Sequence, residues 1–113
     1  MAKENPILKA AQDKGLVDAR ELYFAADVAA SNGNSGRAWI FLNGTTLHLY
    51  ELIFPADLGE KIESLDLKQA RLKKASAFVL APKAELVCEG TTYSFKNFNL
   101  PKQFVAALTE ACG

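Results

Sequence analysis

The chain has 113 residues and no net charge, half of its residues are apolar, and two are cysteines. This length is typical of one domain, and the apolar content is enough for one hydrophobic core. A neutral chain is unlike a dedicated nucleic-acid-binding domain, and two cysteines are too few for a disulfide-rich scaffold. We therefore expect a single domain over residues 1–113 that does not bind nucleic acid.

The N-terminal sequence MAKENPILKAAQDKG lacks the apolar segment of a signal peptide, and no apolar run in the chain is long enough to span a membrane. The sequence therefore predicts a cytoplasmic protein with reduced thiols. Acidic residues predominate in 1–60 and basic residues in 61–113. This uneven distribution of charge either steers a partner or helps self-association, or it is ordinary surface scatter.

The first predicted element is a short helix over residues 4–14. Asn5 can cap it, Pro6 suits its first helical position, and Gly15 would end it. Because the helix has few apolar residues, we expect it to dock on something rather than stand alone.

The predicted β-structure covers residues 18–98 and begins with a strand within 18–30. Leu22, Phe24 and Ala26 alternate with the residues between them, as in a strand, although the alanines also allow a helix. The next six residues, SNGNSG, have the composition of a flexible loop.

Residues 37–50, RAWIFLNGTTLHLY, predict a β-hairpin that turns at Asn43-Gly44. With these two residues as the loop, Leu42 would face Thr45, and any other loop of even length would keep the same two faces. One face is aliphatic, whereas the other mixes aromatic and polar side chains, as a partly covered surface would. The members of this second face are Arg37, Trp39, Phe41, Thr46, His48 and Tyr50.

Residues 54–60 predict a turn through Pro55 and Gly59. The segment that follows, KIESLDLKQARLKKA, fits the apolar stripe of a helix but also two short strands. The strand-rich context favours strands, over residues 62–67 and 69–74.

Residues 84–97 predict a second hairpin that turns at Glu89-Gly90. Its alternation indicates a sheet with one face in the core and one face in water. The predicted inward residues are Leu86, Cys88, Tyr93 and Phe95.

The last predicted element is a helix over residues 101–112, which Pro101 opens. Phe104, Leu108 and Ala111 recur at helical spacing, so one face is apolar and must cover a hydrophobic opening or a sheet face.

In this order, about seven antiparallel strands and a C-terminal amphipathic helix resemble the pleckstrin-homology-like (PH-like) fold, in the group that includes GRAM and bacterial PH domains. Residues 37–50 are similar to the second and third strands of PH domains, and 93–108, YSFKNFNLPKQFVAAL, are similar to the last strand and capping helix. KIESLDLKQARLKK resembles the fourth strand and its successor. The resemblance spans residues 18–112. It implies a mainly β fold: a small barrel of two roughly orthogonal sheets, plugged at one end by the helix.

Many PH domains bind inositol phosphates through basic residues of their first two strands. Here the predicted first strand carries Asp27 and no lysine, and the second supplies only Arg37. A multiply charged phosphate headgroup normally needs several converging cations. The resemblance therefore implies the fold without implying phosphoinositide binding.

No group of residues in the sequence is placed for catalysis or for a metal or cofactor. His48 is the only histidine, and we interpret it as a packed or surface residue. Cys88 alternates inward and is interpreted as a small core residue, whereas Cys112 lies near the chain end. No cofactor and no metal site are predicted.

The densest basic run lies at residues 68–74. In an extended segment Arg71 and Lys73 would share one face and Lys74 would lie on the other. The run would attract anionic lipid, or it would be a lysine-protected strand edge whose field is weakened by acidic residues just upstream.

These observations predict a non-enzymatic binding or scaffold module that recognises a protein or self-associates through an open strand edge. The alternative is a peripheral binder of anionic membrane lipid that uses Arg37 and the 68–74 run. The interaction candidates are Arg37, Trp39, His48, Tyr50, Lys68, Arg71, Lys73 and Lys74.

Overall fold

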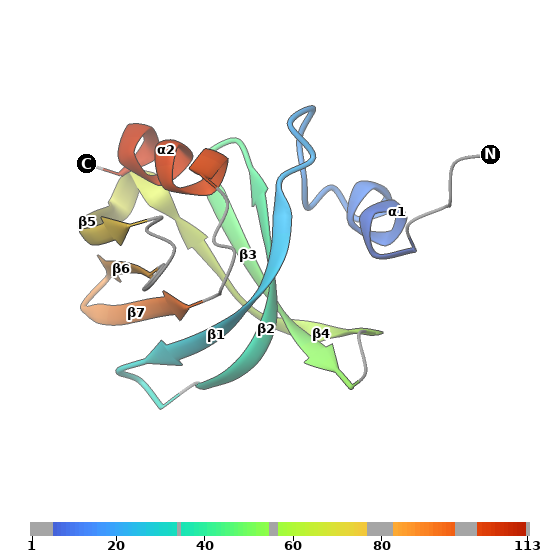
Figure 1. Ribbon diagram of the computed structural model, residues 1–113, viewed down its shortest axis with the longest axis horizontal. Coiled ribbons are helices and arrows are strands. Elements are labelled where there is room, and N and C mark those ends of the chain that lie inside the picture. Colours follow the sequence, from blue (N-terminus) through green and yellow to red (C-terminus); the bar gives the residue numbers. More distant parts are fainter. Residues whose placement is uncertain (1–5, 34, 55–56, 77–82, 97–101, 113) are drawn as a thin grey trace.

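A computed structural model describes residues 6–33, 35–54, 57–76, 83–96 and 102–112 (Figure 1). Within these residues, seven strands lie between an N-terminal and a C-terminal helix, with a short 3-10 helix, η1, between the fourth and fifth strands. The elements are α1 Pro6–Asp13, β1 Tyr23–Ala30, β2 Ser35–Asn43, β3 Thr46–Ile53, β4 Asp57–Asp66, η1 Leu67–Gln69, β5 Ala70–Ser76, β6 Lys83–Cys88, β7 Thr91–Lys96 and α2 Lys102–Ala111.

The strands form one antiparallel sheet in the order β4-β3-β2-β1-β7-β6-β5. The pairing of β1 with β7 joins a four-stranded part to a three-stranded part, and the buried core takes side chains from both parts. Among the described strands β4 and β5 are the two edges, so the predicted barrel is an open sandwich rather than a closed cylinder.

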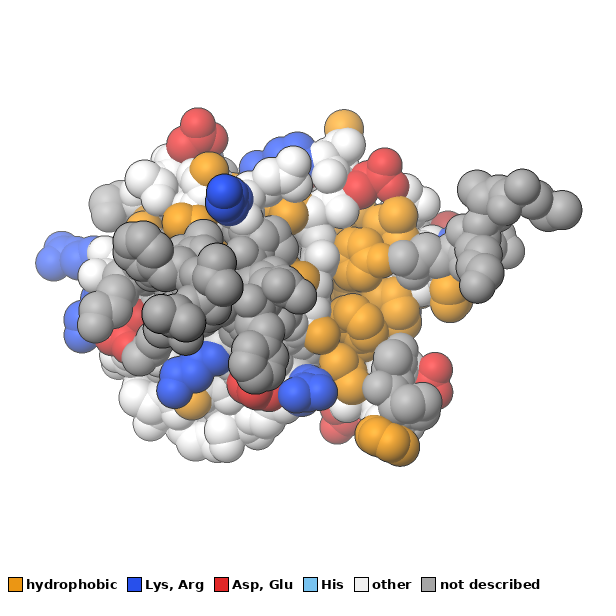
Figure 2. Space-filling model, viewed as in Figure 1, with side chains coloured by type: hydrophobic (Ala, Val, Ile, Leu, Met, Phe, Trp, Pro, Cys, Tyr) orange, Lys and Arg blue, Asp and Glu red, His pale blue; other side chains and the backbone are white. Residues whose placement is uncertain are grey.

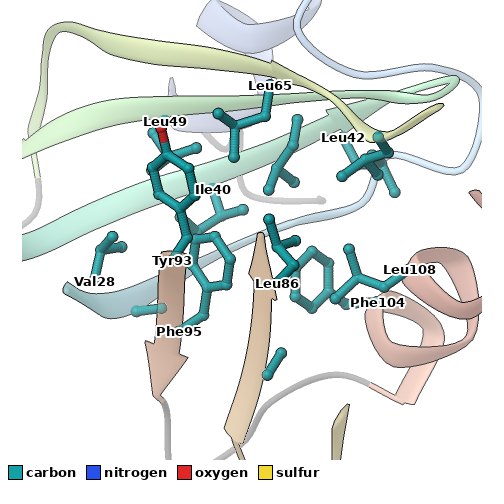
Figure 3. Close-up of a cluster of buried hydrophobic side chains, with 14 of the residues drawn as sticks. Val28, Ile40, Leu42, Leu49, Leu65, Leu86, Tyr93, Phe95, Phe104 and Leu108 are labelled. Atoms are coloured by element: carbon teal, nitrogen blue, oxygen red, sulfur yellow. The ribbon is translucent and has the colours of Figure 1, made fainter. Parts of the chain in front are cut away.

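The predicted capping helix is confirmed as α2, which packs over one end of the core (Figure 3). Phe104 is completely buried, and its ring centroid lies 4.6 Å from that of Phe24 and 6.2 Å from that of Phe95. Leu108, one turn further along, is also buried. Aromatic rings from β1, β7 and α2 therefore meet edge to face at this end of the core.

The hairpin of β2 and β3 has the predicted faces but a different register. Asn43 pairs with Thr46 and Leu42 with Leu47, so the loop is Gly44-Thr45 and the predicted pairing was wrong by two residues. Gly44 has φ +59, as the first loop residue of a type II′ turn requires. The loop remains even in length, and the aliphatic face is buried as predicted.

The two strands predicted for the 61–75 region are confirmed, but β4 begins earlier than expected. Asp57 already pairs with Ile53, and Gly59 therefore lies inside a strand and not in a turn. Pro55 lies outside the described residues. Between the strands, the Asp66 side chain accepts a hydrogen bond from the Lys68 backbone N–H at 3.0 Å and so caps η1.

The second predicted hairpin is confirmed in every respect that the structure tests. Cys88 pairs with Thr91, which leaves Glu89-Gly90 as the loop. The four residues predicted to point inward are all buried, Cys88 among them. Burial raises the pKa of the Cys88 thiol, as expected for a core position.

The predicted N-terminal helix is confirmed as α1, and it does dock on the rest of the chain. A second apolar cluster joins Ala11 of α1, Leu16 and Val17 of the following segment, and Phe41 of β2. Phe41 points to the outer face of the sheet, away from the main core, and is nevertheless completely buried. The sheet thus carries apolar side chains on both faces.

Candidate functional site

The outer face of β1, β2 and β3 carries a group of packed aromatic rings, which we call the aromatic face. Its members are Tyr23, Trp39, Phe41 and Tyr50. Tyr23 lies 6.1 Å from Trp39 and 6.0 Å from Phe41, and Tyr50 lies 5.8 Å from Phe41, as distances between ring centroids. Trp39 Nε1 also donates a hydrogen bond to the backbone carbonyl of Asp57 at 3.2 Å. These contacts fix the rings in one arrangement.

α1 covers only part of the aromatic face. Phe41 is completely buried, whereas Tyr23, Trp39 and Tyr50 stay partly exposed. Figure 2 shows a broad apolar area on this side of the molecule, next to α1. The face therefore combines rigid aromatic side chains with accessible surface, which is the composition of many protein-binding hot spots.

The segment between α1 and β1 is tied to the β2–β3 turn by polar contacts that the sequence reasoning missed. Asp18 Oδ2 accepts hydrogen bonds from Arg20 Nη2 and from the backbone N–H of Gly44, each at 2.7 Å. The Asn43 side chain donates to the Gly15 carbonyl at 2.8 Å. The hydrogen bond from Arg20 is the main cause that lowers the pKa of Asp18 below its ordinary range.

His48 lies on the same face of β3 as Tyr50 and is partly buried. Its Nδ1 is 2.8 Å from Ser64 Oγ on the neighbouring strand. Burial, with a smaller effect of Lys61, lowers the pKa of this imidazole. In the described part of the chain no carboxylate contacts its ring, so the pair lacks the third group that orients a catalytic histidine. His48 therefore connects β3 to β4, and its part in binding a partner stays a prediction.

Arg37 lies apart from the basic interaction candidates of β5. Arg37 Nε is 3.4 Å from Asp27 Oδ1, at the start of β2. Lys73 is 4.0 Å from Glu85, and it lies on β5 together with Arg71. In the sheet, β2 and β5 are separated by β1, β7 and β6.

Lys68 follows the end of β4 in η1, and its side chain is exposed. The register of β5 shifts between Leu72 and Lys74, and the side chain of Lys74 lies outside the described residues. The predicted placement of Arg71 and Lys73 on one face with Lys74 opposite therefore stays a prediction.

A groove at the open end of the sandwich was not predicted at all. It is lined by two carboxylates, Glu51 and Glu63, and by the ring of Tyr93. The sequence did contain a signal for Glu51. It occupies the same face of β3 as the core residues Leu47 and Leu49, because alternate residues of a strand share one face. For Glu63 the same argument would have required the register between β3 and β4, which alternation along one strand does not give.

The described residues form neither a metal-binding cluster nor a membrane-spanning helix. They contain no cluster of three or more His, Cys, Asp or Glu side chains that could hold a metal ion. Neither described helix is long and apolar enough to cross a membrane.

No family model matches this sequence, and no curated protein matches it. Among solved structures, the chain is similar to the apo structure of the activated truncation of Vav1. The TM-score is 0.59 at 6% identity, over 92% of this chain and 31% of the Vav1 chain, so this chain spans less than a third of the length of that chain.

The chain is also similar to the crystal structure of the pleckstrin homology domain of ArhGAP27. Here the TM-score is 0.51 at 17% identity, over 80% of this chain and 94% of the other. At this level of identity the likeness concerns the fold. Seven antiparallel strands followed by a C-terminal helix therefore identify a PH-like fold, as the sequence resemblance predicted.

Proposed function

We propose that this chain is a non-catalytic protein-binding module that docks its partner on the aromatic face. The observation that carries the proposal is the partial cover that α1 gives to Tyr23, Trp39 and Tyr50. Tyrosine and tryptophan bury a large area while losing little side-chain entropy, and they dominate binding energy in many interfaces. Rigid, partly exposed aromatic rings on a PH-like fold support a binding role over an enzymatic one.

Self-association is one form of this function. The described part of β4 is an edge strand. It lies beside the aromatic face, because its Leu58 packs against the apolar cluster that contains Phe41. A second copy would then cover the aromatic rings and pair with the edge in one symmetric contact.

Anionic lipid has less support as the ligand. Arg37 already faces Asp27, and the cations of β5 lie elsewhere in the sheet. An anionic surface attracts a protein through several cations at one place, each contributing about 1 kcal/mol. The described cations give no such convergence.

The experiment compares the wild-type chain with Tyr50→Lys and with Thr46→Lys, a control on the outer face of the same strand. Sedimentation velocity over a range of concentrations measures self-association, and affinity capture measures binding of other proteins. We expect Tyr50→Lys to abolish the association that Thr46→Lys retains, because it places a charge among the rings. Circular dichroism verifies that both variants are folded.

A strictly monomeric chain whose captured proteins are unchanged by Tyr50→Lys would exclude the aromatic face as the docking surface. Sedimentation with vesicles that contain phosphatidylserine examines the lipid alternative. Binding that disappears at high salt and in Arg71→Gln would favour lipid over protein.

A further inference from the structure

The open end of the sandwich contains a groove of about 370 Å³ between β1, β2, β3, β4 and β7. Its apolar walls include Val28, Leu49, Ile62 and Tyr93. Figure 3 shows Val28 at the opposite end of the buried cluster from Phe104 and Leu108, so the groove and α2 occupy opposite ends of the core. The volume is within the range of binding pockets.

A β-bulge in β4 shapes this groove. Leu49 pairs with Glu63, but the next residue of β3, Tyr50, pairs with Lys61, which leaves Ile62 as an extra residue. Both Ile62 and Glu63 consequently line the groove instead of pointing to opposite faces. Bulges of this kind often direct side chains into functional sites.

The charges of the groove are acidic in balance. Arg37, Glu51 and Glu63 are its charged lining residues, and Arg37 is balanced by Asp27 at 3.4 Å. Within the described residues, neither Glu51 nor Glu63 forms an ion pair. Gly59 gives Glu51 its space, because a Cβ atom at position 59 would lie 2.7 Å from Glu51 Oε1.

Glu63 also has unused hydrogen-bonding capacity. Tyr93, which is almost fully buried, lines the groove together with this carboxylate. One oxygen of the Glu63 carboxylate, Oε2, is buried without a hydrogen-bond partner in the described structure. A buried acceptor without a donor is unfavourable, so a ligand that supplies a donor gains more here than at a solvated carboxylate.

We propose that this groove binds one basic side chain, an arginine or lysine, of a partner polypeptide. The charged head contacts Glu51 and Glu63, and the alkyl stem lies against Val28, Leu49 and Ile62. A polypeptide is the source because Ile62 and Glu63 belong to edge strand β4, where an extended backbone can pair. The groove and the aromatic face share no lining residue, although self-association through β4 would use the same strand edge.

The test titrates the full chain, labelled with ¹⁵N, with the peptide acetyl-Ala-Val-Arg-Val-Ala-amide. A second peptide carries citrulline, the neutral isostere of arginine, in the central position. We expect saturable shifts of the Glu51, Ile62 and Glu63 amides with the arginine peptide and about tenfold weaker binding of the citrulline peptide. Binding of the arginine peptide should also weaken as salt rises.

Glu63→Gln and Glu51→Gln should each weaken the arginine peptide severalfold and leave the citrulline peptide unchanged. Glu60→Gln is the matched control, because Glu60 is exposed on the same strand and does not line the groove. Equal affinities for the two peptides, or no shifts at millimolar arginine peptide, would overturn the proposal. The peptide comparison uses the wild-type chain and so does not depend on the folding of any variant.

Discussion

His48 is the only histidine, so the pH dependence of stability between pH 5 and 8 can be assigned to one side chain. Burial lowers its pKa in the folded state below the ordinary value of about 6.5. The unfolded chain therefore binds more protons just below pH 6.5, and stability should fall as the pH decreases from 7.5 to 5.5. Urea midpoints at these two pH values measure this loss.

The control for this prediction is His48→Gln, which should show a flatter stability profile over the same range. The imidazole signal is unique in a proton NMR titration, so its pKa can be read directly. A folded-state pKa above that of an unstructured histidine would contradict the burial argument.

Asp18 connects two loops, and its charge should contribute to stability. Asp18→Asn weakens the hydrogen bonds from Arg20 and Gly44. We expect a loss of about 1 kcal/mol, at the low end for charged hydrogen bonds, because the Arg20 side chain is 45% exposed and screened. The folded-state pKa of Asp18 is lowered. Its contribution is therefore complete above its ordinary pKa and is lost as the pH falls through the lowered value.

Denaturant unfolding at pH 6 and pH 2 measures this difference for Asp18→Asn. Asp13→Asn, on the exposed side of α1, is the control and should change stability little at either pH. A constant difference between wild type and Asp18→Asn at both pH values would show that the effect comes from packing rather than charge.

At the scale of elements, α2 is the plug that closes one end of the core. Phe104→Ala removes a completely buried ring that contacts Phe24 and Phe95. Such a substitution costs about 3–5 kcal/mol, a large part of the stability of a small domain. Thermal unfolding should show a strongly lowered melting temperature for Phe104→Ala and little change for Gln103→Ala, which is exposed. Equal melting temperatures would contradict the plug.

The strands could be predicted because alternation is a local property of the sequence. Leu86, Cys88, Tyr93 and Phe95 are buried as their spacing indicates. A β-bulge is not a local property. Ile62 of β4 is an extra residue only in relation to the pairing of β4 with β3. The acidic groove depends on that bulge, which is why the sequence did not reveal it.

At the scale of the whole molecule, the sheet has two apolar faces, and only one of them could be assigned from the sequence. The main core follows from the inward residues of each hairpin. The aromatic face was recognised as partly covered, but its cover, α1, joins Phe41 through contacts between residues far apart in the chain. The periodicity of the sequence gives no information on such contacts, because they depend on how the segment after α1 positions this helix on the sheet.

This arrangement predicts that α1 can be detached while the main core stays folded. Ala11 is completely buried against the aromatic face and lies outside the main cluster. Ala11→Gln introduces a larger polar side chain there, which should cost about 1–3 kcal/mol. Hydrogen exchange should show loss of protection in α1 and retained protection in β6 and β7. Asp13→Gln introduces the same side chain on the exposed side of α1 and should leave the exchange pattern unchanged. Simultaneous loss of protection in α1 and β6 would show instead that the two apolar clusters unfold as one unit.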